Sequence, residues 1–265
     1  KPFFSIPLPD GGACVADFGG HRLCFLPGDG AGVVPLGRRG RGLGEFTGPL
    51  GMAQSPQGYL LVADDADRVQ VFDLEGRVIQ SMPTPAPPKA SAAASPFHPR
   101  PSAVPEPWLP HGGIAALDGA KEPPGRELEP GELSTPNPRL NPAAASLSTS
   151  TVAPERLRQP YGVAIGPDGR IYVADTGHNR VACLSSTGGL LFAFGSRGAG
   201  PGELNDPRGI AVAAAKVWVA DMCNHRIAVF TLEGRPLRTI GRYGDGPGEF
   251  RHPAGVAFVA DLLLV

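Results

Sequence analysis

The sequence lacks the features that mark several common classes of protein. It has no run of about 20 apolar residues, which a membrane-spanning helix requires. The first residues, KPFFSIPLPD, lack the apolar core and cleavage site of a signal peptide. The four cysteines include no C-x-x-C pair, and the motifs G-x-S-x-G and H-E-x-x-H are absent. We therefore expect a soluble, cytoplasmic chain with reduced thiols, no membrane partner, no cofactor and no metal.

An excess of charge of one sign is also missing. The 265 residues contain 24 Lys and Arg against 25 Asp and Glu, which gives a formal net charge of -1. A polyanion such as RNA would therefore have to be recognised by a local basic patch. The chain is instead rich in Gly and Pro, with 37 and 31 residues, and this content indicates many turns, a disordered segment, or both.

A short motif occurs four times along the chain. Its copies read VADFGGHRLCF, VADDADRVQVF, VADTGHNRVACL and VADMCNHRIAVF, and each contains one Asp and one Arg at matching places. These eight residues are Asp17, Arg22, Asp64, Arg68, Asp175, Arg180, Asp221 and Arg226. The aspartates are 47, 111 and 46 residues apart, so the repeating unit has about 46 residues.

Each repeating unit contains four short β-like runs, which we name strands a to d. A proline 14 or 15 residues before the Asp opens strand a, in the pattern P-x-G from the second unit onward, and a G-x-G-x-G-E stretch follows strand d in most units. One four-stranded sheet cannot bury both of its faces alone, so such units stack around a ring. The sequence therefore predicts an all-β propeller with four recognisable blades and the first two strands of a fifth.

The long interval between the second and third aspartates predicts an insertion. Residues 83–158 contain 17 of the 31 prolines and few branched apolar residues, a composition typical of disorder. We assign blades 1 and 2 to residues 1–82, a disordered Pro-rich insertion to 83–158, and blades 3, 4 and the start of blade 5 to 159–265. Within the insertion, the stretch around Trp108 could serve as a short docking motif.

The linked motifs P-x-G-(V/I)-A, VADxxxxR and G-x-G-P-G-E-F resemble those of the NHL-repeat family, and Asn224-His225 keeps the family's Asn-His pair. This resemblance implies a β-propeller, usually six-bladed, that recruits substrates or binds RNA in tripartite-motif ubiquitin ligases. No RING, B-box or coiled coil is written in the 265 residues. Some relatives are zinc-dependent lyases with histidines near the start of strand a. Tyr161, Arg208 and Ala254 occupy those places here, which disfavours a lyase.

The residues of VADMCNHRIAVF could in principle form a reactive or zinc-binding cluster. Structural zinc requires four ligands at defined spacing, and the ligand types are not reproduced in the other copies. The Asp and Arg recur in every copy, so we interpret them as structural residues that pair across the b–c turn or cap its backbone.

Because strands alternate in direction, the b–c turns and the d–a loops should share one face. This face is basic with some aromatic content, and we predict that it is the binding surface. The predicted surface comprises Arg38, Arg39, Arg41, Tyr161, His178, Asn179, Arg197, Arg208, Asn224, His225, Arg242, Tyr243 and Arg251. A solvated set of arginines offset by Glu45, Glu203 and Glu249 is the simpler alternative.

We therefore predict a non-enzymatic scaffold that binds a protein partner through this face, with no small-molecule substrate and no catalytic residue. It could act as the substrate-recruiting part of a ubiquitin-ligase-type system. RNA binding by the arginine-rich loops is the first alternative, and a metal-dependent, lyase-like propeller enzyme is the second.

Overall fold

The structure is a computed structural model that describes residues 2–73, 75–82, 126–127, 156–259 and 262–265. Almost all regular elements in these ranges are β-strands, arranged mainly as four antiparallel sheets. The prediction of an all-β propeller is confirmed. No helix in the described part of the chain is long and apolar enough to cross a membrane.

Each of the four sheets uses four consecutive strands, in the order a-b-c-d from one edge to the other. Sheet 1 contains β1 (Pro2–Pro7), β2 (Ala13–Asp17), β3 (Arg22–Leu26) and β4 (Val34–Leu36). Sheet 2 contains β7 (Pro49–Gln54), β8 (Leu60–Asp64), β9 (Arg68–Phe72) and β10 (Val78–Met82). Sheet 3 contains β12 (Pro160–Ile165), β13 (Ile171–Asp175), β14 (Arg180–Leu184) and β15 (Leu190–Phe194). Sheet 4 contains β16 (Pro207–Ala213), β17 (Lys216–Asp221), β18 (Arg226–Thr231) and β19 (Pro236–Ile240).

Shorter elements complete the described fold. A fifth unit begins with the hairpin of β20 (Ala257–Val259) and β21 (Leu262–Leu264). The d–a loop after sheet 1 contains β5 (Arg38–Arg39) paired in parallel with β6 (Glu45–Phe46). Two b–c turns form single 3-10 turns, η2 (Thr176–His178) and η3 (Met222–Asn224).

The predicted insertion lies largely outside the described residues. Within it, β11 (Arg126–Glu127) pairs with β19 at the outer edge of sheet 4. At the end of the predicted insertion, Leu157 is only 2% exposed and packs in the core between sheets 2 and 3. Leu157 stands three residues before Pro160, as the core residue Leu204 stands before Pro207.

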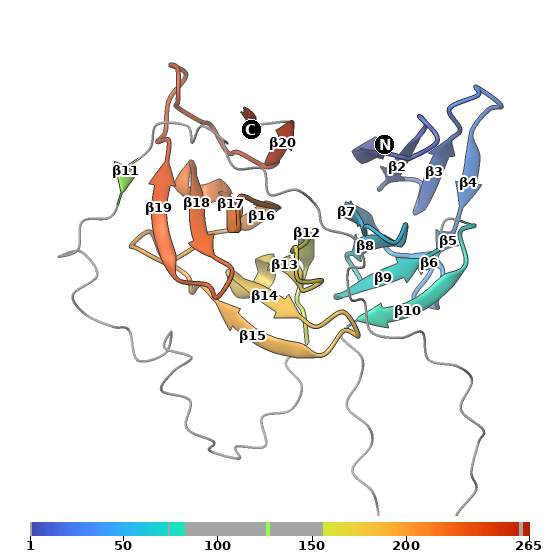
Figure 1. Ribbon diagram of the computed structural model, residues 1–265, viewed down its shortest axis with the longest axis horizontal. Helices are drawn as coiled ribbons and strands as arrows, with labels where there is room; N and C mark the ends of the chain where they lie inside the picture. Colours follow the sequence, from blue (N-terminus) through green and yellow to red (C-terminus); the bar gives the residue numbers. More distant parts are fainter. Residues whose placement is uncertain (1, 74, 83–125, 128–155, 260–261) are drawn as a thin grey trace, which may run out of the picture.

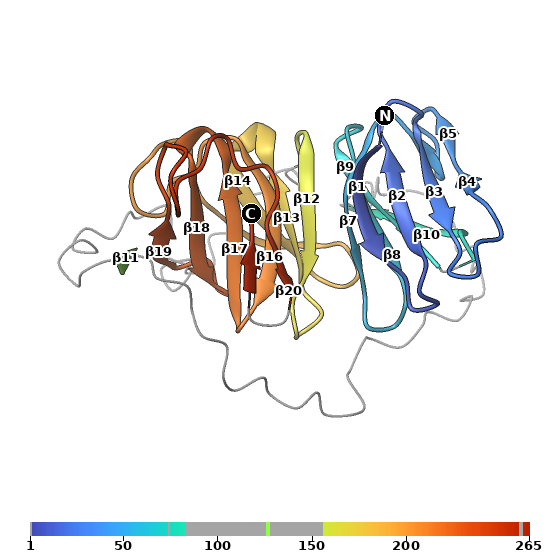
Figure 2. The same cartoon turned by 90° about the horizontal axis from the view of Figure 1, so that it is seen from above.

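The sheets follow one another around an arc (Figure 1), with strands a toward the centre and strands d at the periphery. The N-terminal sheet and β20 stand at the two ends of this arc. Figure 2 shows the sheets from the side, with their strands running between two faces. Apolar clusters fill the spaces between neighbouring sheets, and the b strands β8 and β13 are buried along their whole length.

The glycine of P-x-G is required where neighbouring inner strands meet. A Cβ on Gly51 would lie 2.5 Å from the carbonyl oxygen of Tyr161 in the next sheet. A Cβ on Gly162 would lie 2.4 Å from the carbonyl oxygen of Arg208. Backbone atoms cannot move away as a flexible side chain can, so only glycine fits, and the repeated glycine sets the spacing of the blades.

Candidate functional site

The b–c turns and the d–a loops lie together on one face of the propeller, which we call the loop face. The turns join β2 to β3, β8 to β9, β13 to β14 and β17 to β18. The d–a loops span residues 37–48, 195–206 and 241–252. Turn and loop are in direct contact, because Arg68 at the start of β9 donates hydrogen bonds to the loop that precedes β7.

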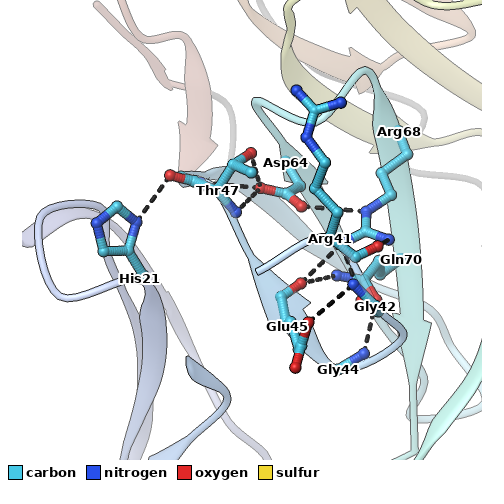
Figure 3. Close-up of polar contacts among 10 residues, drawn as sticks. His21, Arg41, Gly42, Gly44, Glu45, Thr47, Asp64, Arg68 and Gln70 are labelled. Carbon is cyan, nitrogen blue, oxygen red and sulfur yellow. Dashed lines mark hydrogen bonds and ion pairs between the residues drawn. The ribbon is translucent and has the colours of Figure 1, made fainter. Parts of the chain in front are cut away.

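The repeated Asp and Arg form the frame of this face (Figure 3). The Asp64 side chain is fully buried, and its Oδ1 accepts hydrogen bonds from the backbone N–H groups of Thr47 and Gly48, both at 2.9 Å. Its Oδ2 accepts from Arg68 Nε at 3.1 Å. The Arg68 guanidinium also donates to the carbonyl oxygens of Arg41, Gly42 and Glu45 at 2.7, 3.0 and 2.8 Å. One ion pair thus fixes strand b, strand c and the incoming loop together.

The same frame recurs in the other sheets. Asp221 pairs with Arg226 at 2.8 Å, and Arg226 donates to the carbonyl oxygens of Ala199, Gly200 and Glu203. Asp175 pairs with Arg180 at 2.8 Å, and Asp17 pairs with Arg22 at 3.2 Å. The contacts of these pairs are with one another, with backbone groups and with side chains of the adjoining turns and loops, which fits a structural role.

The residue before each of these arginines has a left-handed backbone. The φ values are 54° for His21, 63° for Asp67, 54° for Asn179 and 56° for His225. Asn, Asp and His tolerate this region better than most residues. The residue types at this position are therefore restricted by the backbone, whatever the turn binds.

Two of the predicted surface arginines are neutralised by glutamates of their own loops. Arg38 and Arg242 each lie 2.8 Å from a carboxylate oxygen, of Glu45 and Glu249 respectively. The same carboxylates accept hydrogen bonds from the N–H groups of Gly42 and Gly246 within the G-x-G-x-G-E turns. The pKa of Glu45 and of Glu249 is lowered, chiefly by these N–H donors and next by the paired arginines.

The remaining predicted arginines divide into paired and unpaired side chains. Arg208 pairs with Asp206 at 3.1 Å, and Arg251 pairs with Asp245. Three exposed arginines form no ion pair with a residue that the structure describes, namely Arg39, Arg41 and Arg197. Figure 3 shows the Arg41 side chain directed away from the Asp64 network.

Of the three d–a loops that the structure describes, only one therefore keeps a surplus of positive charge. Residues 38–46 contain three arginines and one glutamate, whereas residues 197–206 contain one arginine and two acids. Residues 242–252 contain two arginines and two acids. The loop face is thus basic near Arg39 and Arg41 and close to neutral elsewhere.

Near the propeller axis, aromatic side chains and one arginine form what we call the axial cluster, made of Phe3, Phe18, Tyr161 and Arg208. The Arg208 guanidinium carbon lies 5.0 Å from the centre of the Tyr161 ring. Phe3 contacts Tyr161 edge-on at 5.4 Å and Phe18 at 6.0 Å between ring centres. Burial raises the pKa of Tyr161, so its hydroxyl stays protonated at neutral pH.

Farther out, four residues around sheet 4 form the rim cluster, made of His225, Tyr243, Arg251 and His252. The His225 ring lies edge-on to Tyr243 at 4.8 Å and to His252 at 4.5 Å. The Arg251 guanidinium carbon lies 5.4 Å from the centre of the Tyr243 ring. Tyr243 remains 60% exposed, so the cluster presents an aromatic surface to solvent.

The other predicted turn residues act within the fold. His178 Nδ1 lies 2.9 Å from Asp175 Oδ2, and Asn224 Nδ2 donates to Asp221 Oδ2 at 2.8 Å. Asn179 Oδ1 accepts from the backbone N–H of Asp206 at 2.9 Å.

Sequence reasoning missed the Phe3 and Phe18 side chains of the axial cluster. A signal for Phe3 was available, because it follows Pro2 as Tyr161 follows Pro160. Tyr161 is the second residue of β12 and is half-buried.

The four cysteines are free, and Cys14 and Cys24 are not partners across the β2–β3 hairpin. Cys14 pairs with Phe25, whereas Cys24 pairs with Val15, so the two side chains point to opposite faces of sheet 1. Burial raises the pKa of the Cys14 thiol to about 12. Among the residues that the structure describes, no group of three or more His, Cys, Asp or Glu side chains is placed to hold a metal.

Several solved structures share the fold. A catalytically inactive virginiamycin B lyase from Staphylococcus aureus, solved with quinupristin, matches at 11% identity and a TM-score of 0.54, over 97% of this chain and 59% of that one. A nidogen/laminin complex matches at 12% identity and a TM-score of 0.51, over 96% of this chain and 67% of that one. The chain therefore spans about 59% of the length of the lyase. At these identities the likeness concerns the fold alone.

Comparison with protein families gives a more specific result. A search of curated proteins gives no match. The NHL repeat model matches at two places, residues 157–184 and 204–230, which cover strands a to c of sheets 3 and 4. These are the strands that carry P-x-G, the buried Asp and its Arg partner. The chain therefore contains NHL repeats within a β-propeller fold.

Proposed function

We propose that this protein is a non-enzymatic scaffold that binds a protein partner through its loop face. The observation that carries the proposal is the pair of exposed aromatic and arginine clusters on a frame of buried ion pairs. Tyr and Arg are enriched among residues that dominate binding energy at protein interfaces. Because Arg68 and Arg226 tie the loops to the sheets, the surface is preformed and loses little entropy on binding.

Charge balance favours a protein partner over RNA. In the loop 241–252 both arginines are held in ion pairs, and in the loop 195–206 the two acids outnumber the single arginine. Single-stranded RNA held only by Arg39 and Arg41 would give a slope of about −1.4 in a plot of log K against log salt, because each neutralised phosphate contributes roughly −0.7. Such binding is weak at physiological salt.

The proposal is tested by placing a photo-crosslinking amino acid at position 243 and, separately, at position 235 on the opposite face. Both positions are exposed to solvent, so a crosslinking side chain at either one can reach a bound protein. In cell extract, we expect discrete protein adducts from position 243 that disappear when Arg208→Ala and Arg251→Ala are added. Adducts of equal yield from both positions would count against the loop face.

RNA binding is the competing outcome and has its own measurement. Oligouridylate binding is followed by fluorescence anisotropy over a range of salt concentrations, in the parent protein and in Arg39→Glu with Arg41→Glu. A slope much steeper than −1.4, abolished by the two substitutions, supports RNA. Recruitment of a substrate to a ubiquitin-ligase-type system would require a RING-containing chain among the crosslinked partners.

A further inference from the structure

A second surface lies away from the loop face, at the outer edge between sheets 1 and 2. A groove of about 430 Å³ is formed there by the β1–β2 turn, strands β3 and β4 with their connection, and the β9–β10 turn. Its walls are apolar, with Leu8, Phe25, Val34 and Leu36 among the lining residues. This volume falls within the range of roughly 300–1,000 Å³ that is usual for binding pockets.

The same corner is filled between the other sheets. The last residue of strand d packs beneath the glycine of the next c–d turn, where a Cβ on Gly188 would lie 2.6 Å from Met82. A Cβ on Gly234 would lie 2.5 Å from Phe194. Met82 and Phe194 are only 2% and 4% exposed.

Sheet 1 keeps this contact with a wider separation, since a Cβ on Gly76 would lie 3.0 Å from Leu36. Its strand d has three residues where β10 has five, although Leu36 follows Leu26 at the same interval as Met82 follows the equivalent Phe72. Val34 is left 56% exposed, and Leu36 is only partly buried. The groove therefore accompanies a shorter strand d and a more exposed apolar wall than the neighbouring sheet has.

The charges around the groove indicate which kind of ligand it favours. Asp10 and Glu75 line it, and no Lys or Arg is among its described lining residues. The nearby Arg77 is already paired, lying 2.7 Å from Asp73 and 3.2 Å from Glu75. The local surplus is negative, so flanking positive charge on a ligand is favoured.

The backbone of the groove disfavours the addition of a β-strand. Pro9, Pro27 and Pro35 all line it, and Pro35 is the middle residue of β4, the edge strand. A proline has no N–H to donate, so β4 cannot offer a continuous ladder. The groove can instead receive a side chain between rigid apolar walls.

We propose that this groove binds a short peptide segment of a protein partner, which inserts a bulky apolar side chain flanked by Lys or Arg. The site lies on the side of the a–b and c–d turns, so it operates independently of the loop face. Insertion buries the exposed Val34 wall, and the basic flanks approach Asp10 and Glu75.

The proposal is tested with three labelled hexapeptides by fluorescence anisotropy on the full chain. The first has Phe-Leu between Arg-Lys and Lys-Arg, the second has Phe-Leu between acidic pairs, and the third has Ser-Ser between the basic pairs. We expect saturable binding of the first peptide only. Absence of this binding, or equal binding of the acidic or the serine peptide, overturns the proposal.

Matched variants locate the binding. Val34→Asn and Glu75→Lys alter the groove, whereas Val33→Asn changes the neighbouring 59% exposed valine and Glu233→Lys changes the equivalent turn of sheet 4. All four positions are solvent-exposed, so folding is preserved. We expect Kd to rise about tenfold in each groove variant and to stay unchanged in the controls. Equal effects in groove and control variants also overturn the proposal.

Discussion

The close approach of the inner strands makes one glycine substitution predictably destabilising. In Gly162→Ala, the new Cβ would lie 2.4 Å from the carbonyl oxygen of Arg208 and 3.0 Å from the backbone nitrogen of Ile210. Ordinary contact begins near 3.4 Å, so strands β12 and β16 would have to separate by about 1 Å. This movement would loosen the packing of the apolar cluster between sheets 3 and 4.

The size of the destabilisation by Gly162→Ala follows from the kind of atoms that clash. Overpacking costs typically about 1–3 kcal/mol, and a clash with backbone belongs at the upper end because no rotamer change relieves it. Alanine also restricts the unfolded chain, which offsets about 0.4–1 kcal/mol of that cost. We therefore expect Gly162→Ala to lower the free energy of unfolding by about 2 kcal/mol.

The chain supplies a matched control in its fifth unit. Gly255 occupies the same place in P-x-G, but a Cβ there would meet no atom within 4 Å. Gly255→Ala should therefore change stability by less than about 0.5 kcal/mol. Urea unfolding followed by circular dichroism measures both variants. Equal midpoints for the two would refute the idea that this glycine sets the blade spacing.

Three further predictions concern the frame, the loop glutamates and the thiols. Arg226→Ala should lower the free energy of unfolding in urea by about 3–5 kcal/mol, because it leaves the buried Asp221 carboxylate without its arginine partner. Arg22→Ala, which removes a side chain that is 47% exposed, should lower it by less than about 1 kcal/mol. The pKa of Glu249 is lowered in the folded state, so its stabilisation is present above the unfolded pKa and is lost as pH falls through the folded pKa; Glu249→Gln should flatten the acid limb of Tm against pH. Iodoacetamide at pH 8 should label the exposed Cys223 first and leave Cys14 unmodified until unfolding, as peptide mass spectrometry can show, and early labelling of Cys14 would contradict its burial.

The fold was predictable because its determinants recur at a fixed period. P-x-G marks where inner strands touch, and the Asp and Arg mark where turn and loop join, so each can be recognised without tertiary information. The charge of the loop face was not equally predictable. Arg38 and Arg242 are neutralised by glutamates seven residues later, a separation that becomes a contact only when the loop folds back on itself.

The insertion boundary shows a second limit of sequence reasoning. Composition assigned Leu157 to the Pro-rich stretch, although the residue is buried between sheets. Composition averages over many residues, whereas burial depends on the place of a single side chain. The position of Leu157, three residues before the proline of strand a, was the better signal.

The places where one blade departs from the repeat are more informative about function than the residues that the blades share. Each blade must satisfy the same packing demands, so the Asp and Arg recur in all four sheets and the glycine recurs in every sheet but the first. A ligand site must differ from blade to blade. Sheet 1 differs most, because it has Phe4 where the other units have the inner-strand glycine and Leu36 where others have a fully buried residue. The exposed Phe3 and the apolar groove both belong to this sheet, which makes it the part of the propeller where partner specificity is most expected.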